Sequence, residues 1–404
     1  MRRVYVGDFR IGEDEKASVM EVLDSGRISE GEKVKQFEKM WAEYIGTRHC
    51  VALSSGTAAL IAGWCALKEY KKYPANRRKV ITSPLTYIAT SNALVVSGFE
   101  PVYVDIDSKT FGITPENIKA HMESVSDPEN YAAINPVHLM GYVCDMDGIN
   151  KIAEKYRLDV VEDSAQAHGS KYRGKTAGSM SLFSIYSFYI AHNIQAGEMG
   201  AVNTGDINIY KMIKKLKANG RLCSCAVCNR HIGKCPHTSL DDEDNDPRFT
   251  HDVIGYNFKT MEFQAALAVS QVKKAGEIFR KRQANVKYLN EKLEKFSGVL
   301  QLPVFDENIS YLAYPLVVRA GGKISRKELR AKLEKAGVEN RPLFGCIPLH
   351  QPAYSYLKNA YTGRLPNADY IGKNGFYIGC HQYLTKDELD YVVSVFEKIF
   401  ASEG

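Results

Sequence analysis

The stretch HCVALSSGTAALIAGWCALKEY, residues 49–70, decides the fold of this chain. Its first part, HCVALSS (49–55), is a short apolar strand, and GTAALIAGWCALKEY (56–70) predicts a helix that opens directly after it. In the turn, Gly56 lets the backbone approach an anion closely, while Thr57 and the first helical amides offer donors at the positive end of the helix dipole. The same turn is also typical of an ordinary helix N-cap.

The neighbouring sequence repeats this alternation of strand and helix. Apolar strands are predicted at KVITSP (79–84), PVYVDID (101–107), AAINPVHL (132–139) and LDVVEDS (158–164), and earlier helices at 16–26 and 33–46. Further helical segments alternate with these strands. The pattern predicts an α/β fold with a mostly parallel, doubly wound sheet that is covered on both faces.

The pattern changes after position 260. MEFQAALAVSQVKKAGEIFRKRQANVKYLNEKLEKF (261–296) predicts one or two long helices. A strand at 311–320 and helices at 325–337 and 386–400 then predict a smaller α+β unit. We therefore expect a large domain over residues 1–260 and a small C-terminal domain, with its linking helices, over residues 261–404.

Composition limits the class of protein. The chain has 404 residues, of which 45% are hydrophobic and 25% charged, with a formal net charge of +6. Basic runs such as 71–79 and 211–217 are typical of solvated helix faces, so we expect no nucleic-acid binding. The polar N-terminus does not resemble a signal peptide, and no apolar window is long enough to span a membrane. We expect a cytoplasmic protein.

Four of the nine cysteines crowd together in LCSCAVCNRHIGKC, residues 222–235. The other five are dispersed. Clustering of this kind in an enzyme with cytosolic character points to a metal rather than to disulfides. The cluster opens an insert that we place at residues 222–250 of the large domain.

Candidate ligand-binding residues follow the predicted strands. Asp163, in VVEDSAQAHG (160–169), lies at the C-terminal end of a strand, the edge where parallel sheets bind ligands. Its carboxylate could pair with a protonated pyridine nitrogen, or it could cap a helix. Tyr87 could stack on a cofactor ring or belong to the core. Asn257, just before a helix, could reach a phosphate.

The stretch SFYIAHNIQAGEMGAVNT, residues 187–204, carries the decisive substitution. A strand-like run ends at Ser187, His192 follows, and a glycine-flanked turn leads into another apolar strand. Stretches built like this in pyridoxal-phosphate enzymes usually carry a lysine where His192 stands. Imidazole cannot form the Schiff base of that lysine, but it can act as a general base near neutral pH.

Six motifs together resemble a known family. SSGTAAL, TYIAT, VHLMG, VEDSAQAHG, SFYIAHNIQAGEMG and GYNFKTMEFQAA fall in the order found in the sugar-nucleotide aminotransferases (DegT/DnrJ/EryC1/StrS) of the aspartate-aminotransferase fold. The resemblance covers nearly the whole chain and implies the fold of type I pyridoxal-phosphate transferases and a homodimer. It also implies the cofactor contacts: Gly56, Thr57, Ala58 and Ser187 on the phosphate, Tyr87 on the ring, Asp163 on the pyridine nitrogen, Gln166 near the ring oxygen, and Asn257 from the neighbouring subunit.

The histidine narrows this resemblance to a subgroup. The chain resembles the 4-keto-6-deoxy-hexose 3-dehydratases, which carry histidine at the position of His192. The resemblance implies that pyridoxamine phosphate (the amine form of pyridoxal phosphate) stays bound without a covalent anchor. It implies dehydration at C-3 of a nucleotide-linked 4-keto-6-deoxy-hexose with His192 as base, giving a 3-deoxy sugar for surface polysaccharide or secondary-metabolite biosynthesis. The alternatives are a sugar-nucleotide aminotransferase with another base, and a non-catalytic homologue that binds cofactor or metal.

The cysteine insert resembles that of the CDP-4-keto-6-deoxyglucose 3-dehydratases. These carry a [2Fe-2S] cluster and receive electrons from a reductase partner with flavin and iron–sulfur centres, whereas other 3-dehydratases have no iron and use glutamate. The resemblance implies Cys223, Cys225 and Cys235 as ligands. The fourth ligand of that group lies beside the residue matching Asp163, where this chain has no cysteine, so Cys228 is the local substitute, with His231 and His237 as alternatives. A zinc site or no metal at all are the alternatives.

Overall fold

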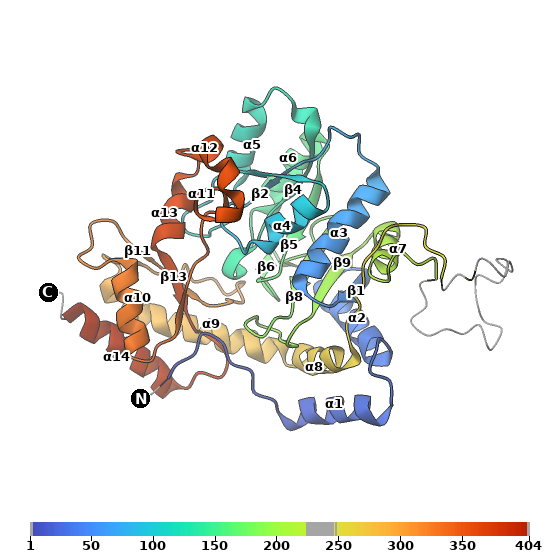
Figure 1. Ribbon diagram of the computed structural model, residues 1–404. Helices are drawn as coiled ribbons and strands as arrows, with labels where there is room; N and C mark the ends of the chain where they lie inside the picture. The colour runs from blue at the N-terminus through green and yellow to red at the C-terminus, as the bar shows by residue number, and fades with distance from the viewer. Residues whose placement is uncertain (1–2, 224–245, 247–248, 402–404) are drawn as a thin grey trace.

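The computed structural model describes residues 3–223, 246 and 249–401, and a sheet of seven strands lies at its centre (Figure 1). The strands are β1 (His49–Leu53), β2 (Lys79–Thr82), β3 (Glu100–Tyr103), β4 (Tyr131–Asn135), β5 (Asp159–Asp163), β8 (Phe183–Ser187) and β9 (Gly200–Thr204). Their order is β1-β9-β8-β5-β4-β2-β3. Neighbours from β8 to β3 pair in parallel, whereas β9 runs antiparallel to both β8 and β1. The mostly parallel α/β fold predicted from the sequence is confirmed.

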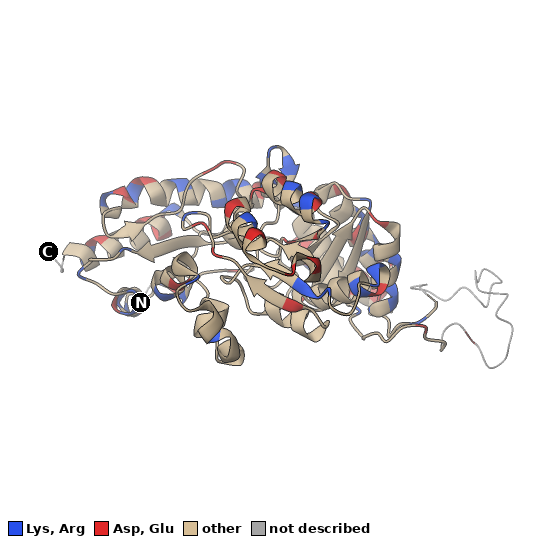
Figure 2. Cartoon of the chain, turned by 90° about the horizontal axis from the view of Figure 1, so that it is seen from above, with Lys and Arg blue, Asp and Glu red and all other residues tan. Residues whose placement is uncertain are grey.

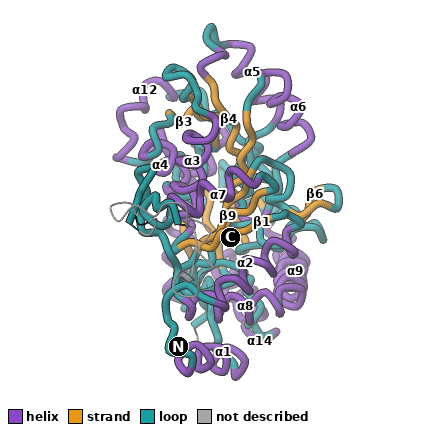
Figure 3. Tube along the Cα trace, turned by 90° about the vertical axis from the view of Figure 1, so that its right-hand side faces the viewer, coloured by secondary structure: helices purple, strands orange, loops and turns teal. Residues whose placement is uncertain are grey.

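Helices cover both faces of this sheet (Figures 1 and 3). One face packs on α3 (Gly56–Lys71), α4 (Ala89–Val96) and α7 (Ile207–Leu216), and the other on α2 (Glu32–Ile45), α5 (Pro115–Ser124), α6 (Met146–Tyr156) and α8 (Glu262–Lys273). Alternation along β1 shows why: Val51 and Leu53 belong to the core under α3, while Cys50 and Ala52 belong to the core under α2. Both faces are apolar, as expected of a buried sheet.

A second unit follows in the chain. Its sheet has four antiparallel strands in the order β10-β11-β13-β12. The strands are β10 (Leu300–Gln301), β11 (Tyr314–Val318), β12 (Asn340–Pro342) and β13 (Gly375–Ile378); the helices are α10 (Arg326–Lys335), α11 (Ile347–His350), α12 (Lys358–Tyr361), α13 (Pro366–Asn374) and α14 (Lys386–Ala401). The N-terminal segment joins this unit, since Val4 bridges to Val338. The domain boundary at residue 260 stays a prediction.

The long helix α9 (Ala275–Leu293) connects the two units. Near its start, Ile278 and Phe279 pack into the core of α2 and α8, and nearer its end Val286 and Leu289 pack into the core of the second sheet. At about 1.5 Å per residue, a helix of 19 residues has the length to do both. The remaining elements are α1 (Glu13–Asp24) and a small hairpin of β6 (Lys171–Tyr172) and β7 (Lys175–Thr176).

Buried carboxylates attach the first two helices to α8. Glu262 accepts hydrogen bonds from the amides of Gly31, Lys33 and Val34 at 2.8–2.9 Å, so a side chain of α8 caps the start of α2. Glu15 of α1 accepts from Lys274 at 2.8 Å. Although burial disfavours its charge, the hydrogen bond from Lys274 and others beside it lower the pKa of Glu15 to about 2.

Two segments that flank residues 224–248 run side by side and form what we call the stem, residues 216–222 and 249–258. Backbone amides of Tyr256, Asn219 and Leu222 donate across the stem at 2.7–2.9 Å. At its base, Phe258 accepts from the amide of Ser54 at 2.9 Å. The stem therefore contacts the chain just before α3 begins.

The surface and the helices agree with the composition. Figure 2 shows Lys and Arg interspersed with Asp and Glu along the outer helices. Within the described residues, no helix has both the length and the apolarity that crossing a membrane would require.

Candidate active site

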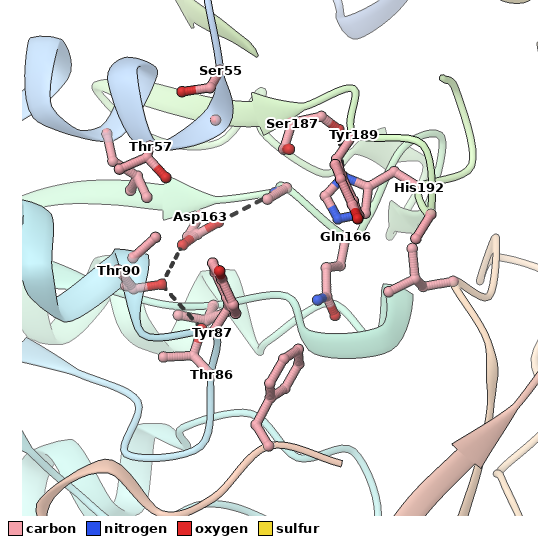
Figure 4. Close-up of a pocket in the computed structure, with 18 of the residues that line it drawn as sticks. Ser55, Thr57, Thr86, Tyr87, Thr90, Asp163, Gln166, Ser187, Tyr189 and His192 are labelled. Atoms are coloured by element: carbon pink, nitrogen blue, oxygen red, sulfur yellow. Dashed lines mark hydrogen bonds between the residues drawn. The ribbon is translucent and has the colours of Figure 1, made fainter. Parts of the chain in front are cut away.

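A cavity of about 430 Å³ lies where the carboxyl ends of the parallel strands meet the second unit (Figure 4). Seven of the predicted site residues line it: Gly56, Thr57, Tyr87, Asp163, Gln166, Ser187 and His192. Ala58 is buried in the first turn of α3, beside them. Asn257 is exposed on the stem and does not line the cavity of its own chain.

The turn at the start of α3 combines a cap with open donors. The hydroxyl of Ser55 accepts the amide of Ala58 at 3.1 Å, which makes Ser55 the N-cap. The described residues provide no acceptor for the amides of Gly56 and Thr57. Two backbone donors at the positive end of a helix can bind an anion. The capping interpretation of this turn is confirmed, and the ligand-binding interpretation stays a prediction.

A glycine is required at position 56 because another strand, β8, approaches the backbone closely there. A Cβ atom at this position would lie 2.6 Å from the Cβ of Ser187, closer than side chains can pack. Ser187 ends β8, and its side chain lies against the start of α3 (Figure 4). The close approach therefore brings the two predicted phosphate contacts together.

Asp163 is a buried carboxylate with both oxygens occupied by neutral donors. The Thr90 hydroxyl donates to one oxygen at 2.8 Å and the Ala165 amide to the other at 3.2 Å. Thr86 in turn contacts Thr90 at 3.0 Å. Burial raises the pKa of Asp163, and the bond from Thr90 opposes that rise. A cationic partner in the cavity would stabilise the ionised form, which suits a protonated ring nitrogen.

The imidazole of His192 is fixed in one tautomer. Its Nδ1 lies 2.6 Å from the carbonyl oxygen of Ser187, and because a carbonyl oxygen only accepts, Nδ1 carries the proton. Nε2 then has a lone pair. Burial lowers the pKa of His192 to about 4, so the ring is neutral at pH 7. A neutral imidazole with a free Nε2 on the cavity wall can act as a base.

No lysine lines this cavity among the described residues. Lys217, the buried lysine at the end of α7, is bound to Glu30 at 2.7 Å and lies 3.6 Å from Glu38. Burial opposes its charge, but Glu38 and Glu30 raise the pKa of Lys217. The amine is thus held as a cation outside the cavity and does not replace the lysine that the motif lacks.

The loop that carries His192, residues 189–196, is held by contacts from remote segments. Asn193 donates to the carbonyl of Ser310 at 3.2 Å, and the Ile194 amide donates to Nδ1 of the buried His168 at 3.2 Å. The ring of His168 also lies edge-on to that of His192, with centroids 6.0 Å apart. The position of the His192 imidazole therefore depends on residues of several elements.

Gln166 is oriented by the backbone. Its Oε1 accepts the amide of Met140 at 3.0 Å, which leaves Nε2 as the group that can donate into the cavity. Met140 has φ of +57°, a conformation that non-glycine residues rarely adopt. The side chain of Gln166 and this unusual backbone conformation stabilise each other.

Several lining residues were missed by sequence reasoning. Thr90 had a signal, because it follows Thr86 by one helical turn within TYIAT. Arg341, Phe344 and Tyr377 come from the second unit and had none. Arg341 binds Glu339 at 3.0 Å and brings a guanidinium to the cavity wall.

The cysteine cluster is only partly within the described residues. Cys223 is buried and directly follows the first stem segment. Cys225, Cys228 and Cys235 lie outside the described residues. Within the parts of the chain that the structure describes, no group of three or more metal-binding side chains is found. The iron–sulfur and zinc alternatives stay predictions.

Comparison with known proteins places this geometry in context. Residues 10–397 match the DegT/DnrJ/EryC1/StrS aminotransferase family. The chain is 32% identical to the lipopolysaccharide biosynthesis protein RfbH of Salmonella typhimurium, over 96% of this chain and 90% of the relative. It is 31% identical to the dTDP-4-dehydro-2,6-dideoxy-D-glucose 3-dehydratase of Saccharopolyspora spinosa, over 98% and 86%. The solved structure of E. coli GDP-4-keto-6-deoxy-D-mannose-3-dehydratase with bound hydrated PLP superposes with a TM-score of 0.85 at 27% identity, covering 98% of this chain and 99% of that one.

Proposed function

Because the chain belongs to the DegT/DnrJ/EryC1/StrS aminotransferase family, we propose that it is a pyridoxamine-phosphate-dependent 3-dehydratase of a nucleotide-linked 4-keto-6-deoxy-hexose. One observation carries the proposal: the cavity presents the neutral imidazole of His192, with Nε2 free, and among the described residues it presents no lysine. The 3-dehydratases among the relatives and solved structures support the choice of reaction.

The residues of the cavity fit the cofactor. The open amides of Gly56 and Thr57 suit its phosphate, and the buried carboxylate of Asp163 suits a protonated ring nitrogen. When bound, pyridoxamine phosphate supplies an amine that condenses with the 4-keto group and a ring that accepts electrons.

We assign a separate role toward the cofactor to each of the remaining predicted contact residues of this chain. Ser187 and Ala58 would complete the phosphate contacts, Tyr87 would cover the face of the ring, and Gln166 would donate from Nε2 toward the ring oxygen. Asp163 would keep the ring nitrogen protonated, which requires the carboxylate to stay ionised despite its burial.

His192 moves the proton. With Nδ1–H held by Ser187, Nε2 would take up the proton whose removal allows the C-3 hydroxyl to leave, and would then give that proton to the departing hydroxyl, which leaves as water. The lowered pKa of His192 keeps the ring ready to accept at neutral pH. Because imidazole cannot form a Schiff base, it moves the proton without attaching the cofactor.

Two parts of the proposal involve more than the cavity of one chain: a second copy of the chain and a source of electrons. Asn257, exposed on the stem, would reach the phosphate of a second copy in a homodimer. Two electrons are needed to complete a turnover. They would come either from a reductase through a cluster on Cys223, Cys225, Cys228 and Cys235, or from an amino donor such as glutamate.

A sugar-nucleotide aminotransferase is the second candidate, favoured by the activity for which the family is named. It would use the same cofactor contacts and nucleotide-linked substrate. A base other than His192 would then return the proton, and a stable amino sugar would form.

The test is identification of the product. Purified enzyme with pyridoxamine phosphate is given nucleotide-linked 4-keto-6-deoxy-hexoses with CDP, GDP, dTDP or UDP, once with glutamate and once with a chemical reductant. A product lacking oxygen at C-3 supports the dehydratase, and an amino sugar in its place overturns it. Iron and acid-labile sulfide, measured on protein purified without oxygen, distinguish the two electron sources.

A further inference from the structure

Arg282 is a fully buried cation on α9, with 1% of its surface exposed. No carboxylate among the described residues pairs with it. Its Nε donates to Oε1 of Gln382 at 3.0 Å, and its Nη1 donates to the carbonyls of Leu312 at 2.8 Å and Tyr311 at 3.3 Å. The Cys380 thiol is a further partner, and it is neutral because burial raises the pKa of Cys380 to about 11. A buried charge held by neutral groups costs stability, so we expect this arginine to serve a role.

The carbonyls that Arg282 holds belong to a segment of the cavity wall, residues 310–313, which we call the brace. Leu312 and Ala313 line the cavity directly. Tyr311 has φ of +49°, a left-handed backbone conformation that is unfavourable for a residue with a bulky side chain. Strained backbone of this kind persists only where the surroundings fix it, and here the guanidinium supplies that fixation.

Hydrogen bonds connect the brace to Gln166 through Met140 and to the loop that carries His192. The amide of Leu312 donates to the carbonyl of Met140 at 3.1 Å, and the amide of Met140 donates to Gln166 at 3.0 Å. At its other end, the carbonyl of Ser310 accepts from Asn193, the neighbour of His192, at 3.2 Å. One segment thus connects the ring contact Gln166 to the loop of the base.

We propose that Arg282 is a positioning residue of the site: it holds the brace, and through the brace it keeps Gln166 and His192 in place. This inference rests on the proposed function for its kinetic consequences. It does not depend on that function for its structural ones.

The charge of Arg282 has an effect on the base as well. Burial lowers the pKa of His192, and the guanidinium lowers it further. Two rings lie edge-on to this imidazole, the buried His168 and the exposed Tyr189, while Glu198, Arg341 and Tyr377 line the same cavity. His168 has its own pKa well below the usual range because of burial, so it is neutral and adds no charge. Removal of Arg282 must therefore raise the pKa of His192.

The experiment uses the full chain with Arg282→Met, which removes the charge, and Arg282→Lys, which keeps the charge but loses the planar fork. Arg280→Met is the control for an exposed arginine on the same helix, and Val286→Ala the control for a loss of packing on the same helix. The first readout needs no turnover: the pKa of the His192 ring, followed by NMR in cofactor-free protein and assigned by the signal missing in His192→Asn. The second is kcat, KM and the acid limb of the pH profile.

We expect the His192 pKa and the acid limb to rise in Arg282→Met, because the cation that lowers this pKa is gone, and to stay unchanged in Arg282→Lys. We expect kcat to fall about 10-fold or more in both variants, since small displacements of catalytic groups are costly. Arg280→Met should match the wild type, and Val286→Ala should lower Tm without moving the pKa.

An unchanged His192 pKa in folded Arg282→Met, or a kcat in Arg282→Lys no lower than in Val286→Ala, overturns the inference. If Arg282→Met does not fold, the kcat of Arg282→Lys against Val286→Ala decides. The NMR result stands even if no 3-deoxy sugar forms, so failure of the proposed function is recognised separately.

Discussion

The two sides of the cavity are built differently. Asp163 ends a strand in the middle of the parallel sheet, and its oxygens are held by Thr90 and Ala165. His192 lies on the loop 189–196, half-buried, and the loop depends on contacts with remote segments. Regular structure therefore fixes Asp163, whereas long-range side-chain contacts place His192.

The largest effect is expected from replacing His192, the proposed base. His192→Asn keeps a side chain that can hydrogen-bond but cannot take up a proton, so kcat should fall about 10²- to 10⁴-fold. The affinity for pyridoxamine phosphate should stay near that of the wild type, because Asp163 and the turn at α3 are untouched. Turnover kinetics and equilibrium dialysis measure the two. Normal turnover in this variant would remove His192 from the mechanism.

The corresponding change at the end of β5 is Asp163→Asn, and we expect it to weaken cofactor binding. Asp163→Asn removes the charge that pairs with the ring nitrogen, and loss of a charged hydrogen bond corresponds to about 10- to 100-fold weaker cofactor binding. Asp159→Asn is the control, because Asp159 lies at the other end of β5 and pairs with Lys71. Equal dissociation constants for the two variants would contradict the role of Asp163.

A smaller effect is expected where the two phosphate contacts meet. Gly56→Ala places a methyl group against Ser187 and should cost about 1–3 kcal/mol of stability and weaken cofactor binding. Gly276→Ala is the control on a helix, since its nearest neighbour would be 3.9 Å away. Thermal unfolding with and without pyridoxamine phosphate separates the two glycines. A Gly56→Ala protein as stable as the control would mean that α3 and β8 can move apart.

The mildest probe is pH. His192 acts as a base only when neutral, so activity on the acid side should be lost as pH falls through its pKa of about 4 and should be constant above that range. The pH profile of kcat, measured with buffers that keep the protein folded, gives this limb. A limb near the ordinary histidine pKa would show that the ring is more solvated than the geometry indicates.

Sequence reasoning found the parts of the site that are local in the chain. The turn after β1, Asp163 at the end of β5 and His192 after β8 each stand in a short motif next to a regular strand. Tertiary contacts decided the rest. Arg341 comes from a different sheet, and Gly56 is set by packing against Ser187. The basic run around Arg282 would be assigned to solvent, because only the packing of α9 shows which arginine is buried.

The stem has a consequence for how such enzymes can vary. Its first segment follows α7 and its second leads to α8, and the two are joined by backbone bonds that do not depend on side-chain identity. The stretch over positions 224–248 could therefore be exchanged for a shorter or a longer one while these closing bonds stay. The base of the stem contacts Ser54, whose neighbours Ser55 and Gly56 line the cavity. Each exchange would therefore be made close to the cavity. New redox or donor preferences could thus be acquired without rebuilding the sheet.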